Sequence, residues 1–396
     1  MPRSPWIVRK ILRMPLTETS DQYSVWVGLI YIFNLIVGTG ALTLPAAFAR
    51  AGWGLSTISL VFLAFMSFMN ATYVIETMAC ANAVFKWKRL QFLKRNSVKD
   101  EAATSQHGYG EMEDPLVCGD SIPSRYYSLD NRIELGEMAN LFLTFAIMIS
   151  MAIHLIITHG PQGSPPAFDV TGMPTLFGAC VYSFMCHHSL PALISPIRGK
   201  SRLGLHVFLD YFLITIFYLL LAFTGAFAFA QLNDLYTLNF VPTDNENILL
   251  EIVEYFLALF PVFTLSTSFP IIAITLRNNL QSLFLDTSRL DSYNFILRKL
   301  IFPVVAIVPP LLLTYFLEDI SILIKFTGSY AGTGIQYIMP TFLVVSARRH
   351  CTNLLGLGVV NKYKSPFSNV AWAVFVLLWS VMCIILVSVN MFEKSS

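Results

Sequence analysis

Residues 34–45 read NLIVGTGALTLP and lie in the middle of a long apolar block, 26–49. A helix needs about 20 apolar residues to cross a bilayer, so this block predicts a transmembrane segment. Two glycines and a proline at mid-depth predict that the helix is interrupted there. The alternative is a glycine-rich face against which another helix packs closely.

An interrupted helix exposes backbone groups that an intact helix uses internally. Freed carbonyls can hold an ammonium group or a sodium ion, and the positive N-terminal end of the second half-helix can hold a carboxylate. The stretch therefore predicts a binding site for a zwitterion. The residues expected to form it are Val37, Gly38, Thr39, Gly40 and Ala41.

The composition places this stretch in a polytopic membrane protein. Of 396 residues, 55% are hydrophobic and only 13% are charged, whereas about a quarter of an average soluble domain is charged. These values exclude a soluble globular enzyme, a disordered protein and a nucleic-acid binder, and the net charge of +2 selects no polyanionic partner. The expected fold is all-α, with nine apolar blocks: 26–49, 55–79, 138–159, 175–197, 204–230, 248–275, 300–317, 320–346 and 368–392.

Basic residues predict the orientation in the membrane. Of 26 Lys and Arg residues, 23 fall on one side of the nine blocks, which the positive-inside rule assigns to the cytosol. We therefore expect a cytosolic N-terminal tail, 1–25, without a signal peptide, and a transmembrane domain, 26–392, in the plasma membrane or an endolysosomal membrane. The segment 81–137 is expected to be a long cytosolic loop, and Glu76 and Asp210 are expected to be solvated near cytosolic ends.

A second polar cluster lies in the block 175–197, in the sequence GACVYSFMCHHSLP of residues 178–191. Polar groups at this depth are costly unless they face a cavity or a partner, so the cluster predicts a second helix break. Cys186 and His187 are not expected to form a catalytic pair, since sequence neighbours point to different helix faces, and no enzyme activity is expected. Either His187 or His188 could sense protons or simply form a hydrogen bond.

Two further clusters contain hydroxyl groups or glycines. Ser266, Thr267 and Ser268 could complete a sodium shell, or could bond back to carbonyls of their own helix. The glycine-rich stretch 326–334 predicts close helix packing. The six cysteines imply neither a disulfide framework nor a zinc site.

Three motifs in order resemble the amino acid/auxin permease family. NLIVGTGALTLPAAFARAGW (34–53) resembles its first helix, VYSFMCHHSLPALISPI (181–197) its sixth and FTGSYAGTGIQYIMPTFLVV (326–345) its tenth. One branch of this superfamily is similar to this chain over residues 21–142 and 143–392.

The resemblance implies a LeuT-like five-plus-five inverted repeat followed by an eleventh helix. The unwound centres of the first and sixth helices would form the substrate site, here Val37–Ala41 together with Tyr182, Ser183, Phe184, Cys186 and His187. In sodium-coupled relatives a hydroxyl pair on the eighth helix helps to hold the ion, and Thr267 and Ser268 are the nearest match, with Ser266 as an alternative.

The chain departs from this pattern by two helices. Three apolar blocks precede the second helix break, where the family has five helices. The point at which the chain joins across the missing helix pair lies near Phe142-Leu143. Loss of two transmembrane helices leaves the membrane orientation of all later helices unchanged. The missing helices belong to the scaffold against which the substrate helices would move.

The expected function is secondary active transport of amino acids or related small zwitterions, by alternating access. The expected partners are a small amino acid and the lipid bilayer, with proton or sodium coupling and no other cofactor. One alternative is a non-transporting receptor or adaptor that senses an amino acid and signals through the 81–137 loop. Another is an inactive short form that lacks a helix pair.

Overall fold

The computed structural model describes residues 23–104, 133–197, 200–241, 248–285, 300–316, 323–324, 326–355 and 361–393. Over these ranges the secondary structure is helical apart from one isolated bridge between Tyr23 and Ile197, which confirms the expected all-α class. The elements are α2 (Val25–Ile36), η1 (Thr39–Thr43), α3 (Leu44–Ala51), α4 (Trp53–Thr104), α5 (Ile133–His159), η2 (Val170–Gly172), α6 (Met173–Ser183), α7 (Leu190–Ile194), η3 (Lys200–Arg202), α8 (Leu203–Ala228), η4 (Tyr236–Phe240), α9 (Ile248–Phe284), α10 (Phe302–Phe316), η7 (Thr327–Gly332), η8 (Gly334–Ile338), α12 (Met339–Leu355) and α13 (Val370–Glu393).

Several of these helices span a membrane. Among the described residues, three helices (α4, α8 and α13) are long and apolar enough to cross a bilayer, or four if α2 and α3 form one bent span. Each of the nine apolar blocks overlaps with at least one helix. The nine-span count itself stays a prediction, because α6 and α10, with 11 and 15 residues, are shorter than a full crossing.

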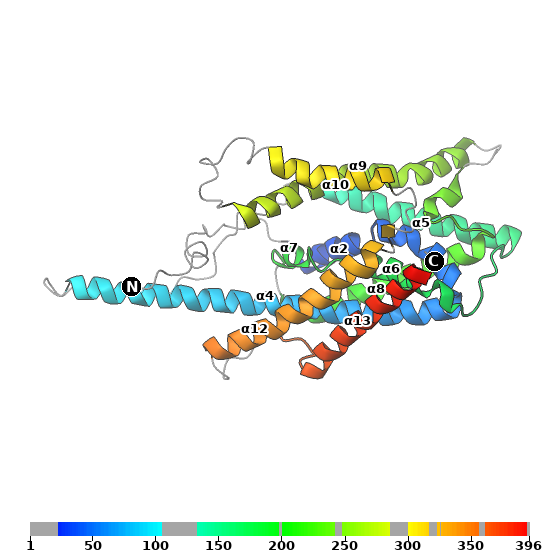
Figure 1. Ribbon diagram of the computed structural model, residues 1–396. Coiled ribbons are helices and arrows are strands. Elements are labelled where there is room, and N and C mark those ends of the chain that lie inside the picture. Colours follow the sequence, from blue (N-terminus) through cyan, green and yellow to red (C-terminus); the bar gives the residue numbers. More distant parts are fainter. Residues whose placement is uncertain are drawn as a thin grey trace.

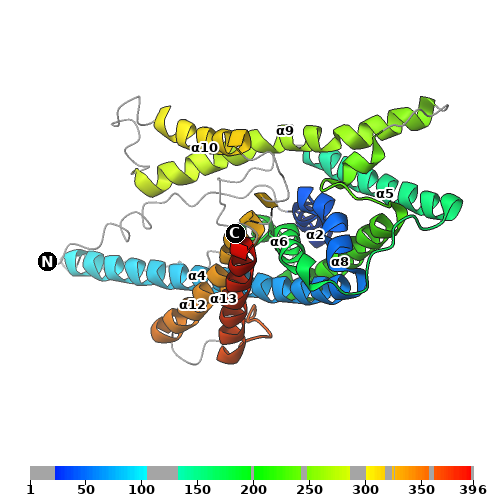
Figure 2. The same ribbon diagram turned by 45° about the vertical axis from the view of Figure 1, so that its right-hand side comes forward.

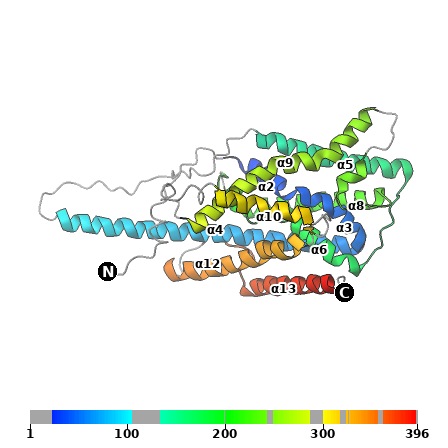
Figure 3. The ribbon, with the colours of Figure 1, turned by 45° about the horizontal axis from the view of Figure 1, so that its top comes forward.

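The helices form a central group with a layer on either side. In Figure 1, α9 and α10 lie along one side of the molecule next to α5, while α12 and α13 lie on the other side. Figure 2 shows α2, α6 and α8 between these two layers. The turned view of Figure 3 confirms that α12 and α13 run beside α4. The two interrupted helices therefore occupy the middle of the bundle.

The segment that was expected to be a long cytosolic loop from residue 81 begins as helix, because α4 continues to Thr104. No glycine or proline occurs between residues 55 and 107, so nothing in the sequence stops the helix where its apolar part ends. The helix projects beyond the rest of the bundle (Figure 1). Residues 105–132 of the expected loop and most of the N-terminal tail, 1–22, lie outside the described residues.

The junction near Phe142-Leu143 lies inside a continuous helix. α5 runs through it from Ile133 to His159 without a break.

Close packing of the glycine-rich stretch is confirmed. A Cβ atom placed on Gly328 of η7 would lie 2.1 Å from the carbonyl oxygen of Gly178 in α6. Only a residue without a side chain permits the two helices to approach this closely. The contact holds α6, the first half of the second interrupted helix, against η7.

Glu76 is buried, not solvated as expected. Its carboxylate accepts two hydrogen bonds from Arg348 of α12, at 2.8 and 2.7 Å, and a third from the backbone N–H of Ser365, at 3.0 Å. The guanidinium also lies 5.5 Å from the ring centroid of Tyr73. This cluster ties the middle of α4 to α12 and to the chain before α13.

Candidate functional site

The first predicted helix break is present at the expected residues. α2 ends at Ile36, η1 begins at Thr39, and the helices on either side meet at 45°. The backbone N–H of Gly38 turns back to the carbonyl of Ile36 at 2.9 Å instead of continuing the helix. The second half, α3, then starts with Pro45 in its first turn, where proline is best tolerated.

The second predicted break is also present. α6 ends at Ser183, and α7 begins at Leu190, again with a proline, Pro191, in its first turn. The segment between them is held by short-range turns, including hydrogen bonds from the Ser189 and Leu190 amides to the carbonyl of Cys186, both at 3.0 Å. Leu-Pro thus opens the second half-helix at both breaks.

The two breaks touch each other through a glycine. A Cβ atom on Gly40 would lie 2.7 Å from Cα of Ser183 and 3.0 Å from its hydroxyl oxygen. At Gly38, by contrast, nothing lies within 4 Å of that position. Two glycines of one motif therefore have different roles: Gly40 permits contact between the breaks, and Gly38 faces open space.

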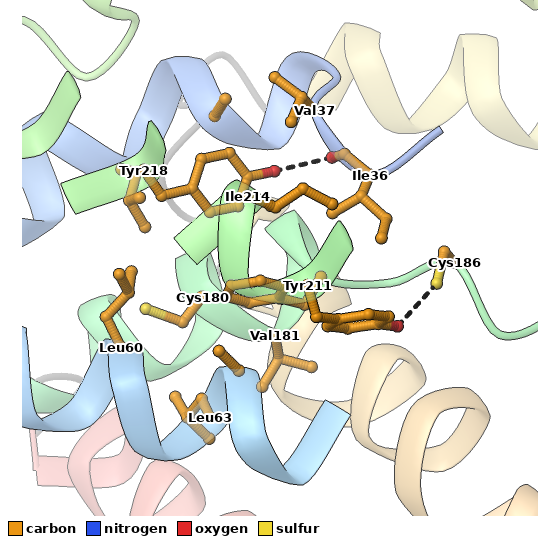
Figure 4. Close-up of a cluster of buried hydrophobic side chains, with 14 of the residues drawn as sticks. Ile36, Val37, Leu60, Leu63, Cys180, Val181, Cys186, Tyr211, Ile214 and Tyr218 are labelled. Carbon is orange, nitrogen blue, oxygen red and sulfur yellow. Dashed lines mark hydrogen bonds between the residues drawn. The ribbon is translucent and has the colours of Figure 1, made fainter. Parts of the chain in front are cut away.

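A tyrosine of α8 joins the two breaks by hydrogen bonds. The Tyr218 hydroxyl lies 2.7 Å from the carbonyl oxygen of Ile36, the contact that Figure 4 marks, and 3.0 Å from that of Ser183. Both carbonyls are at the end of their helix, where no partner within the helix is available. The Ile36 carbonyl also accepts the Gly38 N–H, so among the described residues the Ser183 carbonyl is the one that depends on the Tyr218 hydroxyl alone.

A second tyrosine of α8 anchors the segment after α6. Tyr211 Oη lies 3.1 Å from the sulfur of Cys186, as Figure 4 shows, and accepts a hydrogen bond from Ser67 of α4 at 3.3 Å. The Ser67 hydroxyl also lies 3.3 Å from the carbonyl oxygen of Phe184. The Phe184 ring stacks on that of Tyr211, with centroids 6.3 Å apart. Side chains from α4 and α8 thus satisfy the backbone that the break exposes.

His187 is buried in this cluster with one ring nitrogen unpaired. Its Nε2 lies 3.0 Å from the Ser67 carbonyl oxygen, which can only accept, so Nε2 carries the proton. Nδ1 is then a lone-pair acceptor, and it is buried without a partner. Cys186 and His187 therefore have separate partners and form no catalytic pair.

The other predicted substrate residues lie at the same place. Val37 and Ala41 are fully buried, and Tyr182 is half-buried. The Ser183 hydroxyl bonds back to the Ala179 carbonyl at 2.7 Å. Thr39 lies in η1, but its side chain is outside the described part of the structure.

The three predicted ion-binding residues are on α9. This helix packs against α10, η4 and α5, and the Ser266 side chain is exposed. The side chains of Thr267 and Ser268 lie outside the described residues. The structure does not bring Ser266 to the two breaks, and a sodium site at this place stays a prediction.

A small cavity and an open recess border α3. A cavity beside the breaks, between α3 and α6, has a volume of about 10 Å³, which is room for one water molecule. Arg50 and Asp234 line it and form an exposed ion pair. On the other side of Arg50 an open recess of about 440 Å³ lies against Gly163, Ala226 and Gln231.

Comparison with known proteins identifies the family. The model of the family described as "Transmembrane amino acid transporter protein" matches residues 21–89 and 131–389. The chain belongs to this family. Over 95% of its length it is 42% identical to the transmembrane protein 104 homolog of Drosophila melanogaster and 38% identical to human transmembrane protein 104, with 98% of each relative covered. The Dictyostelium discoideum homolog is 27% identical over 92% of the chain.

These similarities place the chain in the transmembrane protein 104 branch of the family. It is therefore a multi-pass, transporter-family membrane protein. The alignment with the Drosophila homolog covers 502 positions, of which 95% of this 396-residue chain fills about 376. Roughly 126 aligned positions thus have no counterpart here.

The sequence analysis did not identify Ser67, Tyr211 and Tyr218. Their hydroxyl groups, on α4 and α8, contact polar groups of the two breaks. A signal for the tyrosines was present. In α8 the buried residues Val207, Tyr211, Ile214, Tyr218 and Leu221 recur at helical spacing. A tyrosine on such a buried stripe needs a partner for its hydroxyl.

Proposed function

We propose that this protein is a secondary active transporter of amino acids or related small zwitterions that works by alternating access. Its substrate would bind between the two helix breaks, at Val37–Ala41 and at Tyr182–His187. The observation that carries the proposal is the direct contact between the breaks, where Gly40 meets Ser183 and Tyr218 bridges the carbonyls of Ile36 and Ser183.

The chemistry of the contact suits a zwitterion. The Ser183 carbonyl shares the single Tyr218 hydroxyl donor with the Ile36 carbonyl, which also accepts the Gly38 N–H, so an ammonium group with three N–H donors would satisfy the Ser183 carbonyl better. The unpaired Nδ1 of His187 is a further buried acceptor. The N-terminal end of α3 supplies a positive dipole end for a carboxylate.

Alternating access requires that the site opens to each side of the membrane in turn. The half-helices α3 and α6 pack together with a cavity of only about 10 Å³ between them. Separation of these halves would admit an amino acid from the recess beside Arg50. We propose that this recess faces the exoplasmic side and that the N-terminus is cytosolic, as the basic residues indicate.

Exchange in liposomes tests the proposal. The full chain is reconstituted with unlabelled amino acids inside, and entry of a labelled amino-acid mixture is measured without any ion gradient. Wild-type protein should exchange label, and Gly40→Ala should abolish exchange, because its methyl group fills the contact between the breaks. Gly204→Ala in α8 is the matched control and should retain exchange, because its methyl group meets open space and Gly204 is not one of the proposed substrate residues.

Equal loss in both variants would show that the contact between the breaks is not the site. Absence of exchange by folded wild-type protein would refute transport by this chain. The latter result matters because about 126 positions of the Drosophila alignment are unfilled here, enough for a missing helix pair of about 40 residues.

A receptor or adaptor function is the second candidate, and the length of α4 favours it. This helix continues beyond the bundle to Thr104 and carries Lys86, Lys88 and Arg89. Such an extension offers a surface to a cytosolic partner. The receptor hypothesis predicts ligand-induced thermal stabilisation without exchange, and loss of a partner when residues 89–132 are deleted.

A further inference from the structure

Asp210 is a buried acid in the first half of α8. It lies in α8, about 10 Å along the axis from the helix start at Leu203. Its side chain is 5% exposed, and Oδ2 is buried without a hydrogen-bond partner. The sequence alone indicated a solvated residue, so its burial is a correction. A carboxylate in this position is costly unless it is paired or protonated.

The elements packed against α8 bring no counter-charge to it among the described residues. α2 has no charged residue, and the described side chains of α5 include only His154 and His159, at its far end. The charged group of α3, Arg50, pairs with Asp234, and Glu76 of α4 pairs with Arg348. In η3, Lys200 bonds to the Ser195 carbonyl, Arg202 is exposed, and His206, one turn before Asp210, bonds to the Arg202 carbonyl.

Asp210 is next to the group that holds the second helix break. The following residue, Tyr211, contacts Cys186 and Ser67 through its hydroxyl. Asp210 lies on the same buried face of α8 as Val207 and Ile214. The other titratable groups at this place are Cys186 and His187, both buried, and His188, which is exposed. A change of charge at Asp210 would therefore act directly beside the segment that joins α6 to α7.

We propose that Asp210 is the proton-binding residue that couples transport to a proton gradient. The inference rests on the proposed transport function and names its motive ion. Oδ2 of the carboxylate takes a proton from water on the side to which the site is open, becomes neutral, and releases the proton on the other side. A proton needs one lone pair, which Oδ2 offers. A hard cation takes several oxygen ligands, and no other carboxylate among the described residues lies on this face.

The test uses the full chain in liposomes with the membrane potential clamped at zero. An inward gradient of one pH unit supports up to about tenfold accumulation by one-proton symport. Wild-type protein should approach this ratio with a labelled amino-acid mixture, whereas Asp210→Asn should only equilibrate the label. The variant should still exchange label without a gradient, because the substrate contacts are unchanged. Asp210→Glu should recover part of the accumulation.

Accumulation by Asp210→Asn at the wild-type ratio would overturn the inference and leave the transporter intact. Accumulation by wild type under a sodium gradient alone would also overturn it. A wild-type protein that neither exchanges nor accumulates would refute the proposed function instead.

A second measurement does not depend on transport. Infrared titration of the full chain should show the band of an uncharged, buried carboxyl that disappears in Asp210→Asn. The band should persist in Asp169→Asn, which removes a carboxyl from the loop before η2. If the titrating band is unchanged in Asp210→Asn, Asp210 is not the proton-binding residue.

Discussion

Glu76 and Asp210 are both buried acids in long helices, yet their surroundings are opposite. Glu76 accepts three hydrogen bonds, two from Arg348 and one from the Ser365 amide, and so ties α4 to α12 and to the chain before α13. Asp210 lies where α8 meets the second helix break, and its Oδ2 has no partner. Both side chains are buried from water, but among the described residues only Glu76 has a counter-charge.

Glu76 belongs to the scaffold that holds helices together, whereas Asp210 lies beside the candidate site. A buried carboxylate with all its bonds made holds two elements in one arrangement. A buried carboxyl without a partner is stable only when uncharged, and so it responds to protons or to a ligand. Substitutions at the two residues should therefore fail in different ways, the first in stability and the second in coupling.

Glu76→Gln should have the largest effect on stability. The change leaves the partly buried Arg348 without its counter-charge, and removal of one partner of a fully buried pair costs about 3–5 kcal/mol, which is the upper bound here. Thermal unfolding in detergent measures the effect, with Asp210→Asn as the matched control. That control should unfold within a few degrees of wild type. Equal destabilisation by both substitutions would remove the distinction between the two regions.

Gly40→Ala should come next and should sharpen the comparison. Its methyl group would lie 2.7 Å from Cα of Ser183, so backbone must shift at a cost of about 1–3 kcal/mol. Gly38→Ala, two residues away, should be close to neutral. The pair is compared by unfolding temperature. A harmless Gly40→Ala would mean that the two breaks separate easily.

Tyr218→Phe should have a smaller effect. It removes the hydroxyl shared by the Ile36 and Ser183 carbonyls, which is worth about 1 kcal/mol. We expect faster hydrogen exchange at residues 37–41 and 184–189, measured by mass spectrometry. Val207→Ala, on the same face of α8, is a control that removes packing without a hydrogen bond. Unchanged exchange in Tyr218→Phe would show that the hydroxyl does not hold the breaks.

Substitution of the exposed pair should have the smallest effect. Arg50→Gln or Asp234→Asn removes a surface ion pair, typically worth about 0.2–1 kcal/mol. Raising the salt concentration should reduce the difference from wild type, because salt screens exposed charges. A salt-independent loss above about 2 kcal/mol would place this pair with Glu76 and Arg348 as part of the scaffold.

The helix breaks were predictable because their causes are local. Gly38, Gly40 and Pro45 interrupt one helix, and the residues around Pro191 interrupt the other, so each break can be found in about a dozen residues. The all-α class followed equally from the length of the apolar blocks. Likewise, α4 contains no glycine or proline after Gly54, and its continuation past residue 81 was visible in the sequence.

The surroundings of the breaks were not predictable, because their partners are distant in sequence. Arg348 is 272 residues from Glu76, and Tyr218 is 182 from Ile36. A single sequence shows no sign of such pairs, so both buried acids were interpreted as solvated. Tyr211 and Tyr218 were recognisable only as tyrosines on a buried stripe.

The uninterrupted α4 has a mechanical consequence. Its 52 residues extend about 78 Å, more than twice the roughly 30 Å of a bilayer core. Ser67, which contacts the second break, lies about 55 Å along the axis from Thr104. If the helix moves as a rigid lever, a tilt of about 5° around Ser67 displaces the end at Thr104 by about 5 Å. A small rearrangement where substrate would bind thus becomes a large movement outside the membrane.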